Sequence, residues 1–238
     1  MSESNPRSEP LSLVPIGHIH SDFADPFGIP RQPGLASAAR TTLILCPPFD
    51  DPLTVRGLES FSHVWLTFVF HLSPERWTPL VRPPRLGGNA KVGVFATRST
   101  HRPNRLGLSL VALEDIDTRS GVRLTFSGAD LASGTPVVDI KPYLPWLEAR
   151  PGARGGFAAE PPPLCQVVFS DAATQQLAAR HDAASLHPLI HQVIAQDPRP
   201  AYRRQPDERI HGVRLRDLDV RFRAIEEGVL EVLELVPA

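Results

Sequence analysis

Prolines interrupt this chain so often that few segments can hold a long helix. The chain has 26 prolines among its 238 residues, roughly twice the usual share. Because proline lacks a backbone donor and breaks helices, this distribution favours short strands joined by turns and loops. Hydrophobic residues make up 42% of the chain and charged residues 21%. This composition is ordinary for a globular protein, and the length allows a substantial core.

Short runs of β-branched and aromatic residues lie between the turn signals. Their alternation predicts seven strands, with almost no helical periodicity before residue 150. A series of this kind is typical of a small antiparallel β-barrel. The strands are predicted at residues 13–20, 41–45, 63–70, 92–97, 108–113, 122–127 and 137–143.

The composition changes after residue 150, which indicates a second domain. Gly, Pro and Ala dominate residues 151–163, a predicted linker. Beyond it, two segments with helical periodicity and capping residues precede alternating strands. We therefore expect a mainly β fold, in which an antiparallel β-barrel domain (residues 11–150) is followed by a smaller α+β domain (residues 164–238). The polar residues 1–10 are predicted to be a disordered tail. The two predicted helices are residues 171–181 and 185–196.

Charge and cysteine content limit the partners and the compartment. The formal net charge of −1 argues against binding of nucleic acid over the whole surface. The cations are nevertheless clustered, which fits either a local basic face or a solvated surface with compensating acids. Two distant cysteines, a polar amino terminus and no apolar run that could cross a bilayer lead us to expect a soluble cytoplasmic protein. The clusters are Arg76, Arg82, Arg85, Lys91, Arg98, Arg102 and Arg105, and Arg199, Arg203, Arg204, Arg209, Arg214 and Arg216.

Signatures of common cofactor and metal sites are missing from the sequence. It has neither a phosphate-binding loop nor a Gly-x-Gly-x-x-Gly turn between a strand and a helix. The histidine pairs at 18 and 20 and at 187 and 191 have no nearby carboxylate cluster, so no metal site is expected.

Three loops rich in Gly and Pro carry polar side chains that suit a small ligand. Residues 87–109 include Arg98, residues 130–146 contain a Gly-Thr-Pro turn, and an earlier loop holds Arg31 and Gln32 between two prolines. Rigid loops with guanidinium and amide groups suit a ligand that has a carboxylate or hydroxyls. The alternative for the earlier loop is that Pro-Arg-Gln-Pro only shapes a turn.

Five long motifs follow one another along the chain and cover both predicted domains. They are PRQPG at 30–34, VRGLESFSHVW at 55–65, RPPRLGGNAKVGVFATRSTHRPN at 82–104, GTPVVDIKPYLP at 134–145 and QDPRPAY at 196–202. In this order they resemble the TrmO (TsaA-like) family of tRNA methyltransferases, over residues 13–236.

The resemblance implies an S-adenosylmethionine-dependent methyltransferase that binds its cofactor on the β-barrel. The implied substrate is N6 of threonylcarbamoyladenosine, next to the anticodon of certain tRNAs. The family works as a homodimer with cofactor sites near the subunit interface. The alternative is a non-catalytic regulator that binds S-adenosylmethionine or tRNA on the same barrel. By this resemblance, cofactor contacts are expected at Pro30, Arg31, Gln32, His71, Arg98, Leu108, Asp130, Leu131, Ala132, Ser133 and Gly134.

The implied reaction requires alignment of the reactants and a route for one proton. The N6 nitrogen is a poor nucleophile because its lone pair is delocalised, so a nearby group should accept its proton. Asp139, Lys141 and Tyr143 alternate along one strand and share a face. We take Asp139 and Tyr143 as candidate catalytic residues. An equally good alternative is that Asp139 and Lys141 pair and only fix the strand.

The second domain is expected to face the tRNA. Arg199 lies between two prolines, and Tyr202 and Arg203 follow it. A tyrosine ring can stack on an unpaired base, and arginines can meet phosphates. We therefore predict tRNA contacts from Arg199, Tyr202 and Arg203. The alternative is that this turn only locks the second domain onto the barrel.

One departure from the family pattern affects a loop of the predicted site. The family often has Pro-Asn-Pro-Ile-Gly where this chain has Pro-Asn-Arg-Leu-Gly at 103–107. Arg105 adds a charge and removes the restriction that proline places on φ.

Overall fold

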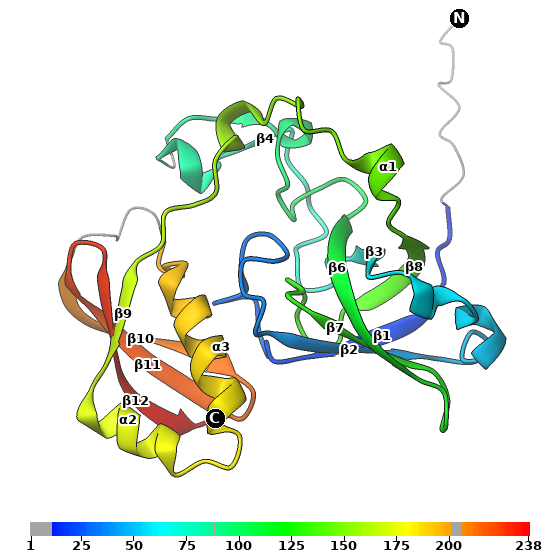
Figure 1. Ribbon diagram of the computed structural model, residues 1–238. Helices are drawn as coiled ribbons and strands as arrows, with labels where there is room; N and C mark the ends of the chain where they lie inside the picture. Colours follow the sequence, from blue (N-terminus) through cyan, green and yellow to red (C-terminus); the bar gives the residue numbers. More distant parts are fainter. Residues whose placement is uncertain (1–10, 88, 201–205) are drawn as a thin grey trace, which may run out of the picture.

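Two modules, each built on its own sheet, make up the protein (Figure 1). The structure is a computed structural model and describes residues 11–87, 89–200 and 206–238. The first module is a closed barrel of six strands, and the second is a four-stranded sheet covered by helices. The predicted mainly β architecture, a barrel followed by an α+β module, is confirmed.

The barrel is antiparallel throughout and closes where β1 pairs with β8. Alternate residues of each strand point inward and are buried, as in Val64, Leu66 and Phe68 of β3. Burying a side chain of this size contributes about 1.5–3 kcal/mol. In spatial order the strands are β1 (Gly17–Ser21), β2 (Arg40–Leu45), β7 (Arg123–Ser127), β6 (Leu106–Asp117), β3 (His63–Val69) and β8 (Pro136–Pro142).

A long excursion between β3 and β6 replaces one predicted strand. The prediction of a strand over residues 92–97 is wrong, because only Val92–Gly93 (β5) is extended, and it pairs with Leu80–Val81 (β4) outside the barrel. The chain then turns through a 3-10 helix at Val94–Ala96, which ends the ladder. We call residues 72–87 and 89–105 the arm.

Short helical turns occupy several of the other connections. They are the 3-10 helices Pro52–Val55, Leu58–Ser60, Pro84–Leu86 and Gly156–Ala158, and the helix α1 (Pro145–Glu148). Figure 1 shows the chain after α1 running along the arm before it enters the second module. Arg85 donates a hydrogen bond of 2.6 Å to the carbonyl of Glu160 in this segment.

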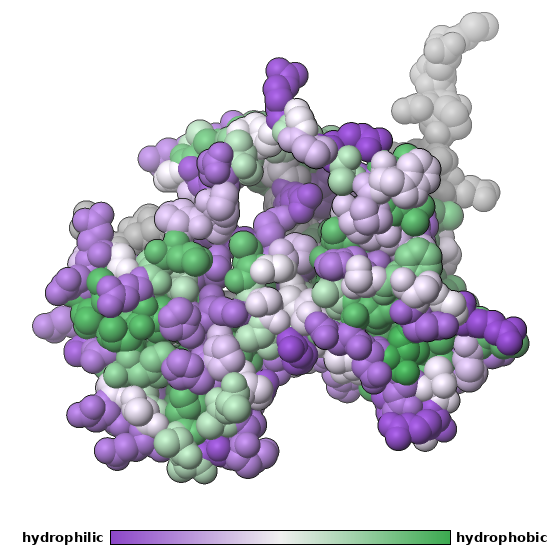
Figure 2. Space-filling model, in the orientation of Figure 1, coloured by the Kyte–Doolittle hydropathy of each residue, from purple (hydrophilic) through white to green (hydrophobic). Residues whose placement is uncertain are grey.

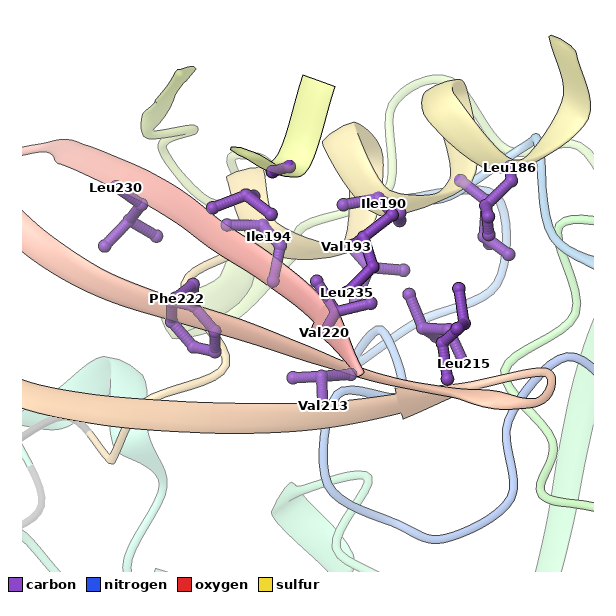
Figure 3. Close-up of a cluster of buried hydrophobic side chains, with 14 of the residues drawn as sticks. Leu186, Ile190, Val193, Ile194, Val213, Leu215, Val220, Phe222, Leu230 and Leu235 are labelled. Atoms are coloured by element: carbon purple, nitrogen blue, oxygen red, sulfur yellow. The ribbon is translucent and has the colours of Figure 1, made fainter. Parts of the chain in front are cut away.

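The second module packs two helices on a four-stranded sheet. Leu186, Ile190 and Ile194 of α3 face the strands, where they meet Val220 and Phe222 (Figure 3). The strand β9 escaped the sequence prediction because it has only four residues after a proline-rich stretch. The elements are β9 (Gln166–Phe169), α2 (Asp171–Ala178), α3 (Ala183–Ala195), β10 (Asp207–Leu215), β11 (Leu218–Glu226) and β12 (Val229–Pro237), with sheet order β10-β11-β12-β9.

Residues 22–39 connect β1 to β2 but pack against the second module, and we call them the shared loop. Phe23, Ala36 and Ala39 are buried in the same cluster as α3 and its sheet. Phe23 also forms an isolated antiparallel bridge with Leu215. The loop therefore belongs to the barrel by sequence and to the second module by packing.

The face of the molecule in Figure 2 is neither uniformly polar nor uniformly apolar. In the view of Figure 2, hydrophilic and hydrophobic residues are mixed over both modules, and the surface is hollowed between them beneath the arm. None of the helices in the described part of the chain is long and apolar enough to span a membrane.

Candidate functional site

A cleft of about 670 Å³ opens at one end of the barrel. Its size falls within the range of small-molecule sites. The shared loop forms one wall and the arm forms the other, while β3, β6 and the turn before β8 form the floor. The lining residues are Pro26, Ile29, Pro30, Arg31, Gln32, Pro33, Trp65, Phe68, Phe70, His71, Leu72, Ser73, Pro74, Thr97, Arg98, Thr100, His101, Arg102, Leu106, Gly107, Leu108, Ser109, Asp130, Leu131, Ala132 and Thr135.

Most of the predicted cofactor residues meet in this cleft. Only Ser133 and Gly134 do not line it. Ser133 instead bonds the backbone of Ser21, accepting from its N–H at 2.9 Å and donating to its carbonyl at 3.1 Å. Gly134 donates to the carbonyl of Ile19 at 2.7 Å. Both residues thus hold the turn before β8 against β1. The predicted residues that line the cleft are Pro30, Arg31, Gln32, His71, Arg98, Leu108, Asp130, Leu131 and Ala132.

Arg98 joins the two walls of the cleft. Its guanidinium, on the arm, donates to the side-chain oxygen of Gln32 in the shared loop. The amide nitrogen of Gln32 in turn donates to the carbonyl of Arg31. The cation is therefore fixed between the two walls, where an anionic ligand group can meet it.

Asp130 places a carboxylate on the floor of the cleft. The hydroxyl of Ser109 donates to it at 2.6 Å. Burial raises the pKa of Asp130, and this effect outweighs the bond from Ser109 and the positive charge of Arg98, which lower it. A raised pKa makes this carboxylate a better proton acceptor than an ordinary aspartate.

His71 lies where β3 passes into the arm. Burial lowers the pKa of His71, and the nearby His18 lowers it further. The neutral imidazole therefore predominates at neutral pH and offers one donor and one acceptor to a ligand.

Strand β6 supplies a floor residue that the sequence analysis missed. Ser109 is buried and points into the barrel. The inward residues on either side of it in β6, Gly107 and Val111, have no polar side chain. A lone serine in this register is a usable sequence signal for a polar site. Gly107 is required because a Cβ at this position would overlap the ring of Phe68, another lining residue.

The two candidate catalytic residues lie outside the lining of the cleft. Asp139 and Lys141 form an ion pair of 3.6 Å, and both side chains are exposed. This arrangement agrees with the alternative prediction, in which Asp139 and Lys141 pair and only fix the strand. Tyr143 packs edge-on against Trp65, with ring centroids 6.2 Å apart. Trp65 does line the cleft, so Tyr143 reaches the site only through this ring.

Arg199 does not have the surface position that the tRNA prediction requires. Its residue surface is only 1% exposed, and its guanidinium bonds the carboxylate of Asp197 at 2.8 and 3.1 Å. An arginine held inside the module cannot offer this group to a phosphate. For Arg199 the structure therefore favours a structural role within the C-terminal module. Tyr202 and Arg203 lie outside the described residues.

The departure at Arg105 has a structural counterpart. Arg105 adopts φ of 51°, which lies in the left-handed region. Proline cannot reach this angle because its ring fixes φ near −65°. The backbone at Arg105 therefore adopts a conformation that the proline of the family pattern would prevent. The Arg105 side chain also pairs with Glu75 at 3.6 Å within the arm.

Metal binding receives no support from the side-chain arrangement. Over the described ranges, His, Cys, Asp and Glu side chains do not form any group of three or more that could hold an ion.

The fold and the cleft define a class of protein: a small closed barrel with a cleft of ligand-binding size at its end, and an appended α+β module. Models of two protein families match these two parts. The tRNA-methyltransferase O N-terminal domain matches residues 18–149, and the TrmO C-terminal domain matches residues 162–238. The chain belongs to the TrmO family.

Individual relatives agree along nearly the whole chain. A Pseudomonas aeruginosa protein named putative S-adenosylmethionine-dependent methyltransferase RcsF is 51% identical over 228 residues, which is 94% of this chain and 97% of the relative. A tRNA (adenine(37)-N6)-methyltransferase of Escherichia coli strain K12 is 46% identical over 229 residues, with 93% and 96% covered. A crystal structure of TrmO from P. aeruginosa has a TM-score of 0.81 at 45% identity, and covers 96% of this chain and 98% of that one.

Proposed function

We propose that this protein is an S-adenosylmethionine-dependent methyltransferase that modifies N6 of adenine in tRNA. Its more specific substrate is threonylcarbamoyladenosine next to the anticodon. The observation that carries the proposal is the cleft, which gathers most of the predicted cofactor residues from five separate segments in a member of the TrmO family. Relatives named as S-adenosylmethionine-dependent and as tRNA (adenine(37)-N6)-methyltransferases support both halves.

The chemistry of the cleft fits S-adenosylmethionine. This cofactor presents a carboxylate, an ammonium, ribose hydroxyls and a flat adenine ring. Arg31 and Arg98 suit the carboxylate, and Asp130 suits the ammonium or the hydroxyls. Leu72 and Leu108, which are exposed in the cleft lining, add apolar surface of the kind that an adenine ring contacts.

Bound S-adenosylmethionine supplies a methyl group that is already activated by its sulfonium. The task of the protein is therefore to align the incoming nitrogen with the methyl group, and alignment of this kind can contribute about 7–11 kcal/mol. The shared loop and the arm form the two walls between which the cofactor would be held.

The N6 proton must leave as the new nitrogen–carbon bond forms. Asp139, exposed on β8, and Tyr143, which follows the end of β8, remain candidate acceptors. Asp130 joins them because it lies in the cleft and burial raises its pKa. Asp139→Asn and Asp130→Asn separate these roles. The acceptor's variant should lower kcat, whereas the loss of a cofactor contact should raise KM for S-adenosylmethionine.

We also propose a cytoplasmic homodimer. The arm exposes large apolar side chains at Trp77, Leu80 and Phe95, and clustered exposed apolar residues mark protein interfaces. A second copy that covers the arm would bury them and enclose the cleft. Tyr202 and Arg203, which follow Arg199 in the sequence, remain proposed tRNA contacts.

The test is methyl transfer to purified tRNA with isotopically labelled S-adenosylmethionine, followed by mass spectrometry of the nucleosides. The proposal predicts labelled methyl only on threonylcarbamoyladenosine, and none on tRNA that lacks this modification. Label on unmodified adenosine would overturn the specific substrate. Cofactor binding without any transfer would favour the non-catalytic regulator.

A further inference from the structure

The shared loop carries cofactor residues at its tip, yet much of its support comes from the C-terminal module. Residues 30–32 line the cleft on one side. On the other side, Ile29, Pro30 and Arg31 face a second cavity of about 270 Å³, whose remaining lining belongs to the C-terminal module and the segment before it, apart from Gly28. The loop thus separates the cofactor cleft from a cavity that the C-terminal module lines.

Helix α3 holds the segment that follows the tip. The side-chain oxygen of Gln192 accepts a hydrogen bond of 2.8 Å from the backbone N–H of Ala38. Its amide nitrogen donates to the hydroxyl of Ser37 at 3.3 Å. One turn later, Gln196 donates to the carbonyl of Leu35 at 3.4 Å. The side chains of these two glutamines therefore bond backbone and hydroxyl groups of a loop segment that has no strand-to-strand hydrogen bonds.

The C-terminal sheet holds the segment that precedes the tip. Arg216 donates through its backbone N–H to the carbonyl of Asp22 at 2.8 Å, and through its side chain to the Asp22 carboxylate at 2.9 Å. Gly28 has φ of 93° and lies so close to Val213 that a Cβ would overlap the valine side chain. Only glycine allows this approach at this angle.

The barrel also bonds the same loop. Arg40, the first residue of β2, donates through its side chain to the carbonyl of Ser37 at 2.9 Å and through its backbone N–H to the carboxylate of Asp22 at 2.8 Å. Gly34 donates to the carbonyl of Gly128 at 2.8 Å, and Gly128 donates to the carbonyl of Ala39 at 3.0 Å. A further bond of 2.9 Å runs from Ser133 to the carbonyl of Phe23. These bonds fix the ends of the loop and one point beside the tip, so loss of a single contact to α3 should loosen the loop without releasing it.

We propose that the C-terminal module sets the affinity for S-adenosylmethionine by holding the shared loop in its binding shape, with Gln192 as a positioning residue. This inference rests on the proposed function, in which residues 30–32 contact the cofactor. A loop that is ordered before binding loses less conformational entropy when the ligand arrives, which raises affinity. The C-terminal module then acts on the cofactor step as well as on tRNA.

The test compares two glutamines that make the same kind of bond. Gln192→Ala removes the acceptor for the Ala38 N–H. The matched control is Gln176→Ala, which removes an acceptor for the N–H of Leu235, a bond of 2.7 Å wholly inside the C-terminal module. Calorimetry on the full chain should show S-adenosylmethionine Kd roughly three- to tenfold weaker for Gln192→Ala and unchanged for Gln176→Ala. KM for the cofactor should follow Kd, while kcat stays constant.

A conservative variant and a second readout guard against a general loss of structure. Gln192→Glu keeps an acceptor for Ala38 and should restore the affinity. Amide hydrogen exchange of residues 35–39 should speed up in Gln192→Ala and not in Gln176→Ala. Unchanged Kd or unchanged exchange in Gln192→Ala would overturn the inference, as would equal weakening in both alanine variants. A wild-type protein that binds no S-adenosylmethionine would instead overturn the proposed function, and the exchange comparison would still decide whether α3 holds the loop.

Discussion

The two walls of the cleft are built in opposite ways. The shared loop buries Phe23, Ala36 and Ala39 in the core of the C-terminal module. In the arm, the strands β4 and β5 have two residues each, and Phe95 is 75% exposed. One wall is therefore held by packing within the chain, whereas the other leaves large apolar side chains exposed, which the proposed second copy would cover.

The difference shows how a small barrel can build a cofactor site without a nucleotide-binding sheet. A closed barrel has little surface at its end, so the site must be extended by loops, and each loop needs its own support. The C-terminal module supports one loop, and the proposed second copy of the chain would support the other. Substitutions in the two walls should therefore have different consequences.

The largest expected difference is between two phenylalanines. Phe23→Ala removes a fully buried ring from the cluster that joins the shared loop to the C-terminal module. It should lower the free energy of unfolding by about 3–5 kcal/mol and weaken S-adenosylmethionine binding as well. Phe95→Ala should change the stability of the single chain by less than about 0.5 kcal/mol and weaken self-association instead. Urea denaturation and sedimentation measure the two effects, and the reverse pattern would contradict the assignment of the walls.

Arg199 tests whether the turn behind the shared loop is structural. Arg199→Ala leaves the buried carboxylate of Asp197 without this cation, and breaking a buried pair typically costs about 3–5 kcal/mol. The control is Arg221→Ala, which removes a partly exposed ion pair with Glu234 and should cost less than about 1 kcal/mol. A melting temperature of Arg199→Ala equal to that of the wild type would restore the tRNA-binding interpretation of this residue.

Arg98 tests the contact between the walls. Arg98→Ala removes a charge-assisted bond to Gln32 and a cation in the cleft. Because such contacts contribute about 1.5–3 kcal/mol, S-adenosylmethionine should bind roughly ten- to a hundredfold more weakly. Arg85→Ala removes an arginine of the same arm that donates to the Glu160 carbonyl and is not among the residues that line the cleft, and its Kd should match that of the wild type. Equal Kd values for both variants and the wild type would remove Arg98 from the site.

Asp130, between the walls, should have the smallest effect on stability, and the effect should depend on pH. Because burial raises the pKa of Asp130, the charged form is penalised in the folded protein, and this penalty grows as pH rises above the ordinary pKa of aspartate. Asp130→Asn should therefore be slightly more stable than the wild type at neutral pH. The advantage should shrink as pH falls, because the wild-type carboxyl becomes neutral. Melting curves from pH 4 to 7 measure this, and an advantage that grows on acidification would contradict the raised pKa.

Local sequence patterns predicted most of the fold. Alternation located the six barrel strands, and helical periodicity located α2 and α3. Ser170 caps α2, because its hydroxyl accepts from the Ala173 N–H at 3.0 Å, whereas Asp182 before α3 makes no side-chain capping bond. The same alternation wrongly predicted a strand at residues 92–97. An apolar run shows that a segment could form a strand, but not whether another strand lies beside it to pair with. Alternation also failed at β9, whose parallel pairing with β12 depends on strands far along the chain.

The site was predictable as a set of residues but not as an arrangement. Family motifs pointed to Arg31, Arg98 and Asp130, which the structure brings to one cleft. The burial of Arg199 could not be foreseen, because its carboxylate partner sits two residues away and an exposed turn would have the same sequence. Support of the shared loop by Gln192 was equally hidden, since the bond joins residues 154 positions apart.

The contrast between the walls can be measured in one experiment on the full chain, namely amide hydrogen exchange with and without S-adenosylmethionine. Exchange rates report local opening, which is rarest where backbone groups are buried and bonded. The account predicts that the shared loop is protected in the free protein and gains little on binding, whereas the arm exchanges quickly and becomes protected when the cofactor is added. A shared loop that exchanges as fast as the arm in the free protein would contradict the claim that the C-terminal module builds one wall of the site.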